Sequence, residues 1–222
     1  MAAIFLKPGR EKSLRQRHPW IFSGAVAQLE GAPASGDTVD VFTAQREMIG
    51  RAAFSPHSNI RARMWTWQPD QKVDGEFIHH RLQQAIAARR AIISIEETDA
   101  VRLVHGESDG LPGVVVDQYG DALVVQLLSA GADFWRETIA HGLVDLLKPC
   151  CIIERSDVDV RALEGLPQRV AALYGAAPQP RVIIHENGLR FGVDLLGGQQ
   201  ASISTSGATG SGCASWWAGA AC

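Results

Sequence analysis

The sequence predicts an α+β protein in which a small N-terminal β-barrel precedes a central mixed α/β domain. Short strand-like segments, separated by Gly, Pro, Asn and Ser, fill the first third of the 222 residues. A helix with an N-cap signal follows, and beyond it strands and helices alternate. The 46% hydrophobic content suffices for one substantial core or two small ones. We expect domains at residues 1–73 and 74–196, then a Gly/Ala/Ser-rich tail at 197–222 that we expect to be disordered.

A cation-rich segment opens the first domain. It contains Lys7, Arg10, Lys12, Arg15 and Arg17. Pro19 interrupts any helix, so we expect a short basic turn or helix followed by the start of a strand at Trp20. Residues 1–67 hold nine Lys/Arg against five Asp/Glu, and residues 68–222 hold twelve against nineteen. This asymmetry favours an anionic partner for the N-terminal domain.

Three strands are predicted in the rest of the first domain, at Thr38 to Thr43, Met48 to Phe54 and Ile60 to Trp67. Period-two alternation in the last strand divides it into two faces. The apolar face carries Ile60, Ala62 and Met64, and the basic, aromatic face carries Arg61, Arg63, Trp65 and Trp67. Arginines can meet phosphates and tryptophans can stack on bases. The alternative is that the tryptophans pack under a neighbouring element while the arginines reach solvent.

The second domain should begin after a polar linker, Pro69 to Gly75. Asp74 is the expected N-cap of a helix from Glu76 to about Ile95. The further expected elements are strands at 101–104, 113–117, 122–128 and 151–154, a helix from about Asp133 to Lys148, a short helix within 155–163, and a hairpin of 181–186 with 189–195.

The sequence contains few signals that indicate the cellular compartment of the protein. The N-terminus lacks a signal-peptide core, and no apolar run approaches the roughly 18 residues of a membrane span. We expect a cytoplasmic protein without membrane contact. The four cysteines, Cys150, Cys151, Cys213 and Cys222, lack CxxC spacing, and we expect free thiols and no metal site.

Two other motifs invite functional interpretations. Gly207 to Gly212 is glycine-rich, but neither a helix nor an acidic residue follows, as a nucleotide-binding loop would need. Ser108 with His105 could be imagined as a hydrolase pair, which would lose turnover on Ser108→Ala. The surrounding Gly, Asp and Pro residues are more typical of a tight turn, so we rank this interpretation lowest.

Several ordered motifs resemble the large-subunit ribosomal RNA cytosine-5 methyltransferases. They are Lys7-Pro8-Gly9-Arg10-Glu11-Lys12-Ser13, His18-Pro19-Trp20-Ile21-Phe22-Ser23-Gly24-Ala25, Arg61-Ala62-Arg63-Met64-Trp65, Gly106-Glu107-Ser108-Asp109-Gly110-Leu111-Pro112-Gly113, Leu127-Leu128-Ser129-Ala130-Gly131-Ala132 and Arg155-Ser156-Asp157-Val158. The resemblance covers residues 4 to about 200.

The resemblance implies an N-terminal PUA domain that binds RNA and a central α/β domain. In the family a C-terminal Rossmann-like domain holds S-adenosylmethionine and the catalytic cysteine, and we expect this domain to be missing from the chain because the family pattern is lost after Gln200. We therefore expect no catalytic residue and no S-adenosylmethionine binding in this chain. The RNA-binding residues that we expect are Lys7, Arg10, Lys12, Arg15, Arg17, Trp20, Arg61, Arg63 and Trp65.

The sequence departs from the family pattern after Gln200. Residues 204–213, back-translated with G/C-rich codons and read one base out of phase, can give Leu-Asp-Gln-Arg-Gly-His-Arg-Leu-Arg, which is close to the missing family motif. We hypothesise a frameshift near Ile203 and hence a truncated, non-native tail. An intact reading frame in the coding DNA would contradict this hypothesis.

These observations predict an RNA-binding portion of a large-subunit ribosomal RNA methyltransferase that is itself inactive. The alternative is a fragment that docks on a protein partner in ribosome assembly. Salt dependence separates the two, because phosphate binding weakens steeply with ionic strength. Homodimer formation is left open.

Overall fold

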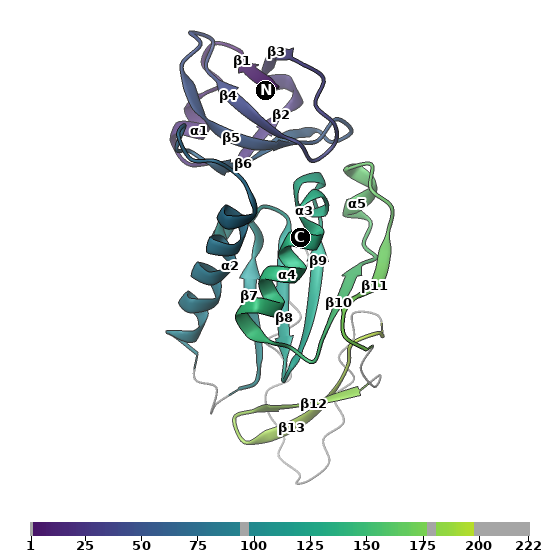
Figure 1. The fold of residues 1–222 in the computed structure, drawn as a ribbon. Coiled ribbons are helices and arrows are strands. Elements are labelled where there is room, and N and C mark those ends of the chain that lie inside the picture. The colour runs from purple at the N-terminus through teal and green to yellow at the C-terminus, as the bar shows by residue number, and fades with distance from the viewer. Residues whose placement is uncertain (1, 94–97, 177–180, 198–222) are drawn as a thin grey trace, which may run out of the picture.

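The computed structural model describes residues 2–93, 98–176 and 181–197, and it places a curled β-sheet domain against one end of an α/β domain (Figure 1). Apart from Gly197, the expected tail at 197–222, with its glycine-rich stretch and two of the cysteines, lies outside the described residues. No helix in the described ranges is long and apolar enough to cross a membrane.

The N-terminal domain, called the barrel below, is a six-stranded sheet in the order β2-β6-β5-β4-β1-β3. The strands are β1 (Ala3–Leu6), β2 (Trp20–Phe22), β3 (Val26–Glu30), β4 (Thr38–Phe42), β5 (Met48–Phe54) and β6 (Ile60–Thr66), with helix α1 (Lys12–Arg15) and the 3-10 turn η1 (Ser23–Ala25). β1 runs parallel to β4, and the other pairs are antiparallel. The three strands predicted between 38 and 67 are confirmed.

Two strands of the barrel, β1 and β3, were not predicted from the sequence, for different reasons. All four residues of β1 are buried, so the strand shows no alternation of polar and apolar residues. The central residues of β3 are exposed, and this strand lies at a sheet edge where burial imposes little pattern. The core of the barrel is mostly aliphatic and includes Ile4, Leu6, Val39, Val41 and Met64.

Helix α2 (Gly75–Arg90) connects the barrel to the second domain. The predicted N-cap is confirmed, because the Asp74 carboxylate accepts a hydrogen bond from the amide of Phe77 at 3.0 Å. The helix ends at Arg90, earlier than predicted, and residues 94–97 lie outside the described part of the chain.

The second domain is built on a five-stranded sheet in the order β11-β10-β9-β8-β7. Its strands are β7 (Ala100–His105), β8 (Val114–Tyr119), β9 (Ala122–Leu127), β10 (Cys151–Ser156) and β11 (Arg169–Tyr174), with the 3-10 turn η2 (Gly106–Asp109) after β7. β9 and β10 are parallel and the other pairs antiparallel. The expected strands are confirmed, and β11 is an additional edge strand.

The crossover from β9 to β10 differs in detail from the prediction. It contains two helices, α3 (Ala130–Phe134) and α4 (Arg136–Leu147), instead of one. α3 starts three residues early because the Ser129 hydroxyl caps the amide of Ala132 at 3.2 Å. After β10, the short helix is α5 (Val160–Leu163).

The last described elements form the hairpin of β12 (Arg181–Glu186) and β13 (Leu189–Asp194), as predicted. Asn187 and Gly188 take φ +50 and +77, the left-handed values that a two-residue hairpin turn requires. The hairpin packs against the end of the central sheet through Ile184, Val193 and other buried residues.

Candidate nucleic-acid interface

Residues 7–17, called the basic segment below, lie against the barrel as a turn followed by α1. Gly9 takes φ +79, and the amide of Arg10 bonds to the carbonyl of Lys7 at 3.0 Å. The side chain of Leu14 is only 1% exposed and belongs to the barrel core. Because this leucine anchors the segment, its cations are left facing solvent.

The five cations of the basic segment are all exposed but differ in their partners. The Lys7 ammonium donates to a backbone carbonyl at 3.0 Å. Arg15 forms an exposed ion pair with Glu47 at 2.6 Å, and such pairs contribute little stability. The guanidinium of Arg17 lies 5.3 Å from the centroid of the Trp67 ring.

Arg10 and Lys12 have neither an ion pair nor a side-chain hydrogen bond to any described residue. The only acidic residue of the basic segment, Glu11, is partly buried and forms no ion pair with either cation. These two cations are therefore free to meet an external anion.

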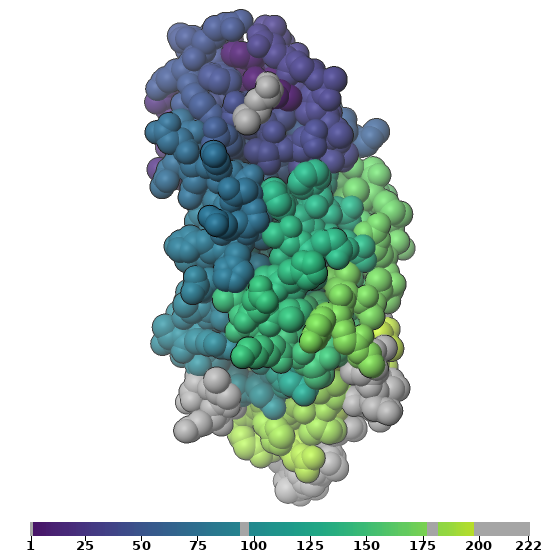
Figure 2. Space-filling view, viewed as in Figure 1, coloured from purple at the N-terminus to yellow at the C-terminus, as the bar shows by residue number. Residues whose placement is uncertain are grey.

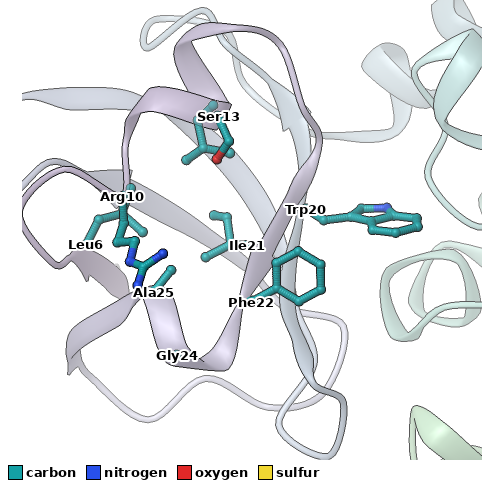
Figure 3. A pocket seen from close by; sticks show the side chains of 9 residues that line it. Leu6, Arg10, Ser13, Trp20, Ile21, Phe22, Gly24 and Ala25 are labelled. Atoms are coloured by element: carbon teal, nitrogen blue, oxygen red, sulfur yellow. The ribbon is translucent and has the colours of Figure 1, made fainter.

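A pocket of about 320 Å³ lies beside the basic segment (Figure 3). It is lined by Leu6, Arg10, Ser13, Leu14, Trp20, Ile21, Phe22, Gly24 and Ala25. Alternation in β2 buries Ile21 and leaves the Phe22 ring 48% exposed. An exposed ring near a free guanidinium suits a planar group joined to an anion.

Three of the expected RNA-binding side chains lie elsewhere, at the contact between the two domains, which we call the domain junction. Trp65 is 1% exposed and belongs to the core cluster of the second domain. Arg63 is 7% exposed. Trp20 is half-buried and borders the pocket, but in Figure 3 its ring points toward the second domain, and the ring N–H donates to Glu107 of η2 at 2.8 Å. Burial corrects the expectation that the side chains of Arg63 and Trp65 face an external partner. For Trp20 that expectation stays a prediction.

The alternation predicted for β6 is present, but the second domain covers the face that was expected to meet solvent. Ala62 and Met64 lie in the barrel core, whereas Arg63 and Trp65 point to the other side. The alternative of packing under a neighbouring element is therefore the one observed for Trp65. Arg61 is half-buried and donates to the carbonyl of Pro56.

Glu164, at the end of α5, is the acidic centre of the domain junction and is 1% exposed. Its carboxylate accepts hydrogen bonds from Arg63 at 2.8 Å, from the Ser55 hydroxyl at 2.8 Å and from the Ala130 amide at 3.2 Å. Burial alone would raise the pKa of Glu164, but the Arg63 charge and hydrogen bonds from Ser58 and Ser55 outweigh it, and the pKa is lowered.

Glycines allow close contact across the domain junction. A Cβ at Gly131 would lie 2.4 Å from the Ala53 Cβ and 3.0 Å from the Trp65 ring. A Cβ at Gly36, which has φ +88, would lie 2.6 Å from Phe134. On the face shown in Figure 2 the two domains accordingly meet without a gap.

The hydrolase pair is not assembled. Ser108 and His105 are both exposed, and no hydrogen bond joins them in the described structure. The adjacent Asp109 is engaged by Arg89 at 2.8 Å. Among residues 2–93, 98–176 and 181–197, no group of three or more His, Cys, Asp and Glu is placed to hold a metal ion.

Three residues of these sites were not predicted from the sequence. They are Phe22 in the pocket and the two carboxylates of the domain junction, Glu107 and Glu164. Alternation in β2 could have indicated Phe22, because Trp20 and Phe22 share a face opposite the apolar Ile21. No local signal could have indicated the carboxylates, since they meet Trp20 and Arg63 only through tertiary structure.

Comparison with known proteins places the first domain in a family. The PUA-like domain profile matches residues 4–67, which span the barrel strands described above. Residues 4–67 form a PUA-like domain. The junction contacts of Trp20, Arg63 and Trp65 are thus made by the PUA-like domain itself.

Curated relatives extend the similarity over most of the chain. The ribosomal RNA large subunit methyltransferase I of Vibrio cholerae is 45% identical over 198 residues, which are 89% of this chain and 50% of the relative. The protein of the same name from Shewanella amazonensis is 47% identical over 197 residues, again 89% and 50%. The chain is homologous to these methyltransferases and spans about half of their length.

Solved structures share the fold at low identity. A candidate SAM-dependent methyltransferase from Streptococcus mutans superposes with a TM-score of 0.74 at 19% identity, over 92% of this chain and 51% of that chain. A candidate methyltransferase complexed with SAH gives 0.72 at 18% identity, over 87% and 48%. The PUA-like domain and the mixed α/β domain are therefore arranged as in these two solved structures.

Proposed function

We propose that this chain is the RNA-recognition portion of an S-adenosylmethionine-dependent ribosomal RNA (cytosine-5) methyltransferase, and that the basic segment and its pocket bind large-subunit RNA. The observation that carries the proposal is the pair of free, exposed cations, Arg10 and Lys12, on a PUA-like domain, where Arg10 lines a pocket together with the exposed Phe22 ring. The homology to ribosomal RNA large subunit methyltransferase I supports the choice of RNA.

Each part of the surface contributes a different interaction. The guanidinium of Arg10 can donate two parallel hydrogen bonds to a phosphate, and the Lys12 ammonium acts as a compact charge. Phe22 offers a ring face to an unpaired base. Phosphate contacts supply affinity without sequence choice, so we assign target selection to base contacts in the pocket.

We also propose that the described residues do not hold S-adenosylmethionine. The turn from β9 into α3 is a strand-to-helix connection of the kind that cradles nucleotide cofactors. Here it is closed from two sides, because the Ala130 amide bonds to Glu164 at the end of α5 and Gly131 packs against Ala53 and Trp65 of the barrel. The residues at this turn do not fit the cofactor.

The two described cysteines are unsuited to attack on a base. Desolvation, with hydrogen bonds to Asp121 and Cys151, raises the pKa of the Cys150 thiol to about 12, so it stays protonated near neutral pH. Cys151 is buried at 1% exposure. A nucleophilic cysteine needs an accessible thiolate. This supports our proposal that the described residues carry no methyl-transfer chemistry.

Isothermal titration tests both parts of the proposal. The purified chain is titrated with S-adenosylmethionine and then with a structured large-subunit RNA fragment at about 50 and 200 mM salt. We expect no heat with the cofactor and RNA binding that weakens as salt rises. Heat from the cofactor would overturn the proposed inactivity, and RNA affinity that does not change with salt would overturn the phosphate-binding surface.

A further inference from the structure

Arg81 on α2 is a cation without a counter-charge. Its guanidinium lies 5.1 Å from the centroid of the Phe77 ring and 3.4 Å from the position of a Cβ at Gly110. The side chain is half-buried and forms no ion pair or side-chain hydrogen bond with any described residue. Burial lowers the pKa of Arg81, and no acidic neighbour offsets that effect.

The two carboxylates of η2, Glu107 and Asp109, are already engaged by other groups. Asp109 accepts from Arg89 at 2.8 Å and from the His105 amide at 2.6 Å. Glu107 accepts from Trp20 and lies 3.8 Å from the Arg63 guanidinium. An anion from outside the chain would stabilise a half-buried guanidinium that has no ion pair and no side-chain hydrogen bond within the chain.

The position of Arg81 links it to the surface proposed above. η2 joins the barrel through Trp20, whose ring packs edge-on against His18 with centroids 5.7 Å apart. His18 directly follows the basic segment and is exposed. The barrel and α2 also adjoin along one side of the molecule (Figure 2). η2 thus contacts Trp20 next to the basic segment through Glu107, and Gly110, directly after η2, lies beside Arg81.

We propose that Arg81 binds a backbone phosphate of an RNA strand that crosses from the PUA-like domain onto α2. This inference rests on the proposed function and extends it to the second domain. Packing on Phe77 holds the guanidinium in place, so its paired N–H groups are oriented for two hydrogen bonds to one phosphate. The tight domain junction keeps the two halves of the path in fixed register.

The test compares Arg81→Gln with Lys148→Gln, which removes a charge from an exposed cation at the C-terminal end of α4. Affinity for a labelled large-subunit RNA fragment is measured by fluorescence anisotropy at about 50 and 200 mM salt. We expect Arg81→Gln to weaken binding roughly 3- to 10-fold and to reduce the salt slope by about 0.7 to 0.9. Arg81→Lys should recover part of the affinity.

Three results are informative. Lys148→Gln should bind as the unmodified chain does. If Arg81→Gln binds RNA as Lys148→Gln does while the unmodified chain shows salt-dependent binding, the inference fails and the proposed function stands. If the unmodified chain itself shows no salt-dependent binding, the proposed function fails first, and the phosphate contact at Arg81 fails with it.

Discussion

The basic segment and strand β6 both carry cations next to aromatic residues, yet they have opposite surroundings. Arg10 and Lys12 are exposed and lack partners among the described residues, whereas Arg63 is buried against Glu164 at 2.8 Å. Residue type and spacing do not separate the two cases. The difference comes from a carboxylate 101 residues away in sequence, so only tertiary structure distinguishes a binding cation from a structural one.

Glu164→Gln should have the largest effect on stability. It leaves the buried Arg63 charge without its main partner, and breaking such a pair costs about 3–5 kcal/mol. Denaturant unfolding measures the loss, with Glu47→Gln as the control because its ion pair with Arg15 is exposed. Equal effects of the two substitutions would contradict a structural role for the junction pair. Replacing both Arg63 and Glu164 by apolar residues should recover much of the loss.

The pH dependence of stability should report the same carboxylate. The pKa of Glu164 is lowered from its ordinary value of 4.5, so its contribution is present above that pH and is lost as pH falls through the lower folded value. The stability difference between the unmodified chain and Glu164→Gln should therefore shrink in acid. Unfolding free energies at neutral pH and at about pH 3 test this, and a constant difference would contradict the sign.

Gly131→Ala should have an intermediate effect. Its added methyl group would overlap Ala53 and Trp65, and overpacking of this kind costs about 1–3 kcal/mol. Gly24→Ala is the matched control, because a Cβ there meets nothing within 4 Å. Calorimetric melting should show a lower Tm for Gly131→Ala alone. An unchanged Tm would mean that the domain junction can relax without loss.

Trp20→Phe should have a smaller effect. It removes the hydrogen bond to Glu107 while keeping a ring, and we expect a loss of about 1 kcal/mol. The affinity for RNA should not change, because the Trp20 ring is engaged at the domain junction. A clear loss of RNA affinity in this variant would return Trp20 to the RNA-binding surface, since base stacking contributes to affinity and not to the salt slope.

Much of the fold follows from local patterns. Alternation located β4, β5 and β6, and the Asp74 cap located the start of α2. The uniformly buried β1 and the mostly exposed β3 lack the half-buried pattern that defines a strand in sequence. The burial of β11 does alternate, but its sequence, Arg-Val-Ala-Ala-Leu-Tyr, does not alternate between polar and apolar residues.

The candidate site was predictable only in part. The cations of the basic segment lie on the surface, where their density and the charge asymmetry of the chain favoured an anionic partner. Alternation also assigned Arg63 and Trp65 correctly to one face of β6, but it could not reveal that a second domain covers that face. Period-two alternation shows which residues share a face of a strand, but it does not show which other element packs against that face.

The most direct test of the account removes the free cations of the basic segment and compares them with free cations elsewhere. Arg10→Gln with Lys12→Gln is matched by Lys148→Gln with Arg190→Gln, since all four side chains are exposed. RNA affinity is measured across about 50 to 200 mM salt, with unfolding free energies as the check on folding. We expect only the first pair of substitutions to lower the salt slope, by about 1.4 to 1.8, and both pairs to leave the free energy of unfolding unchanged within about 0.5 kcal/mol. Equal slopes for the two pairs would contradict this expectation.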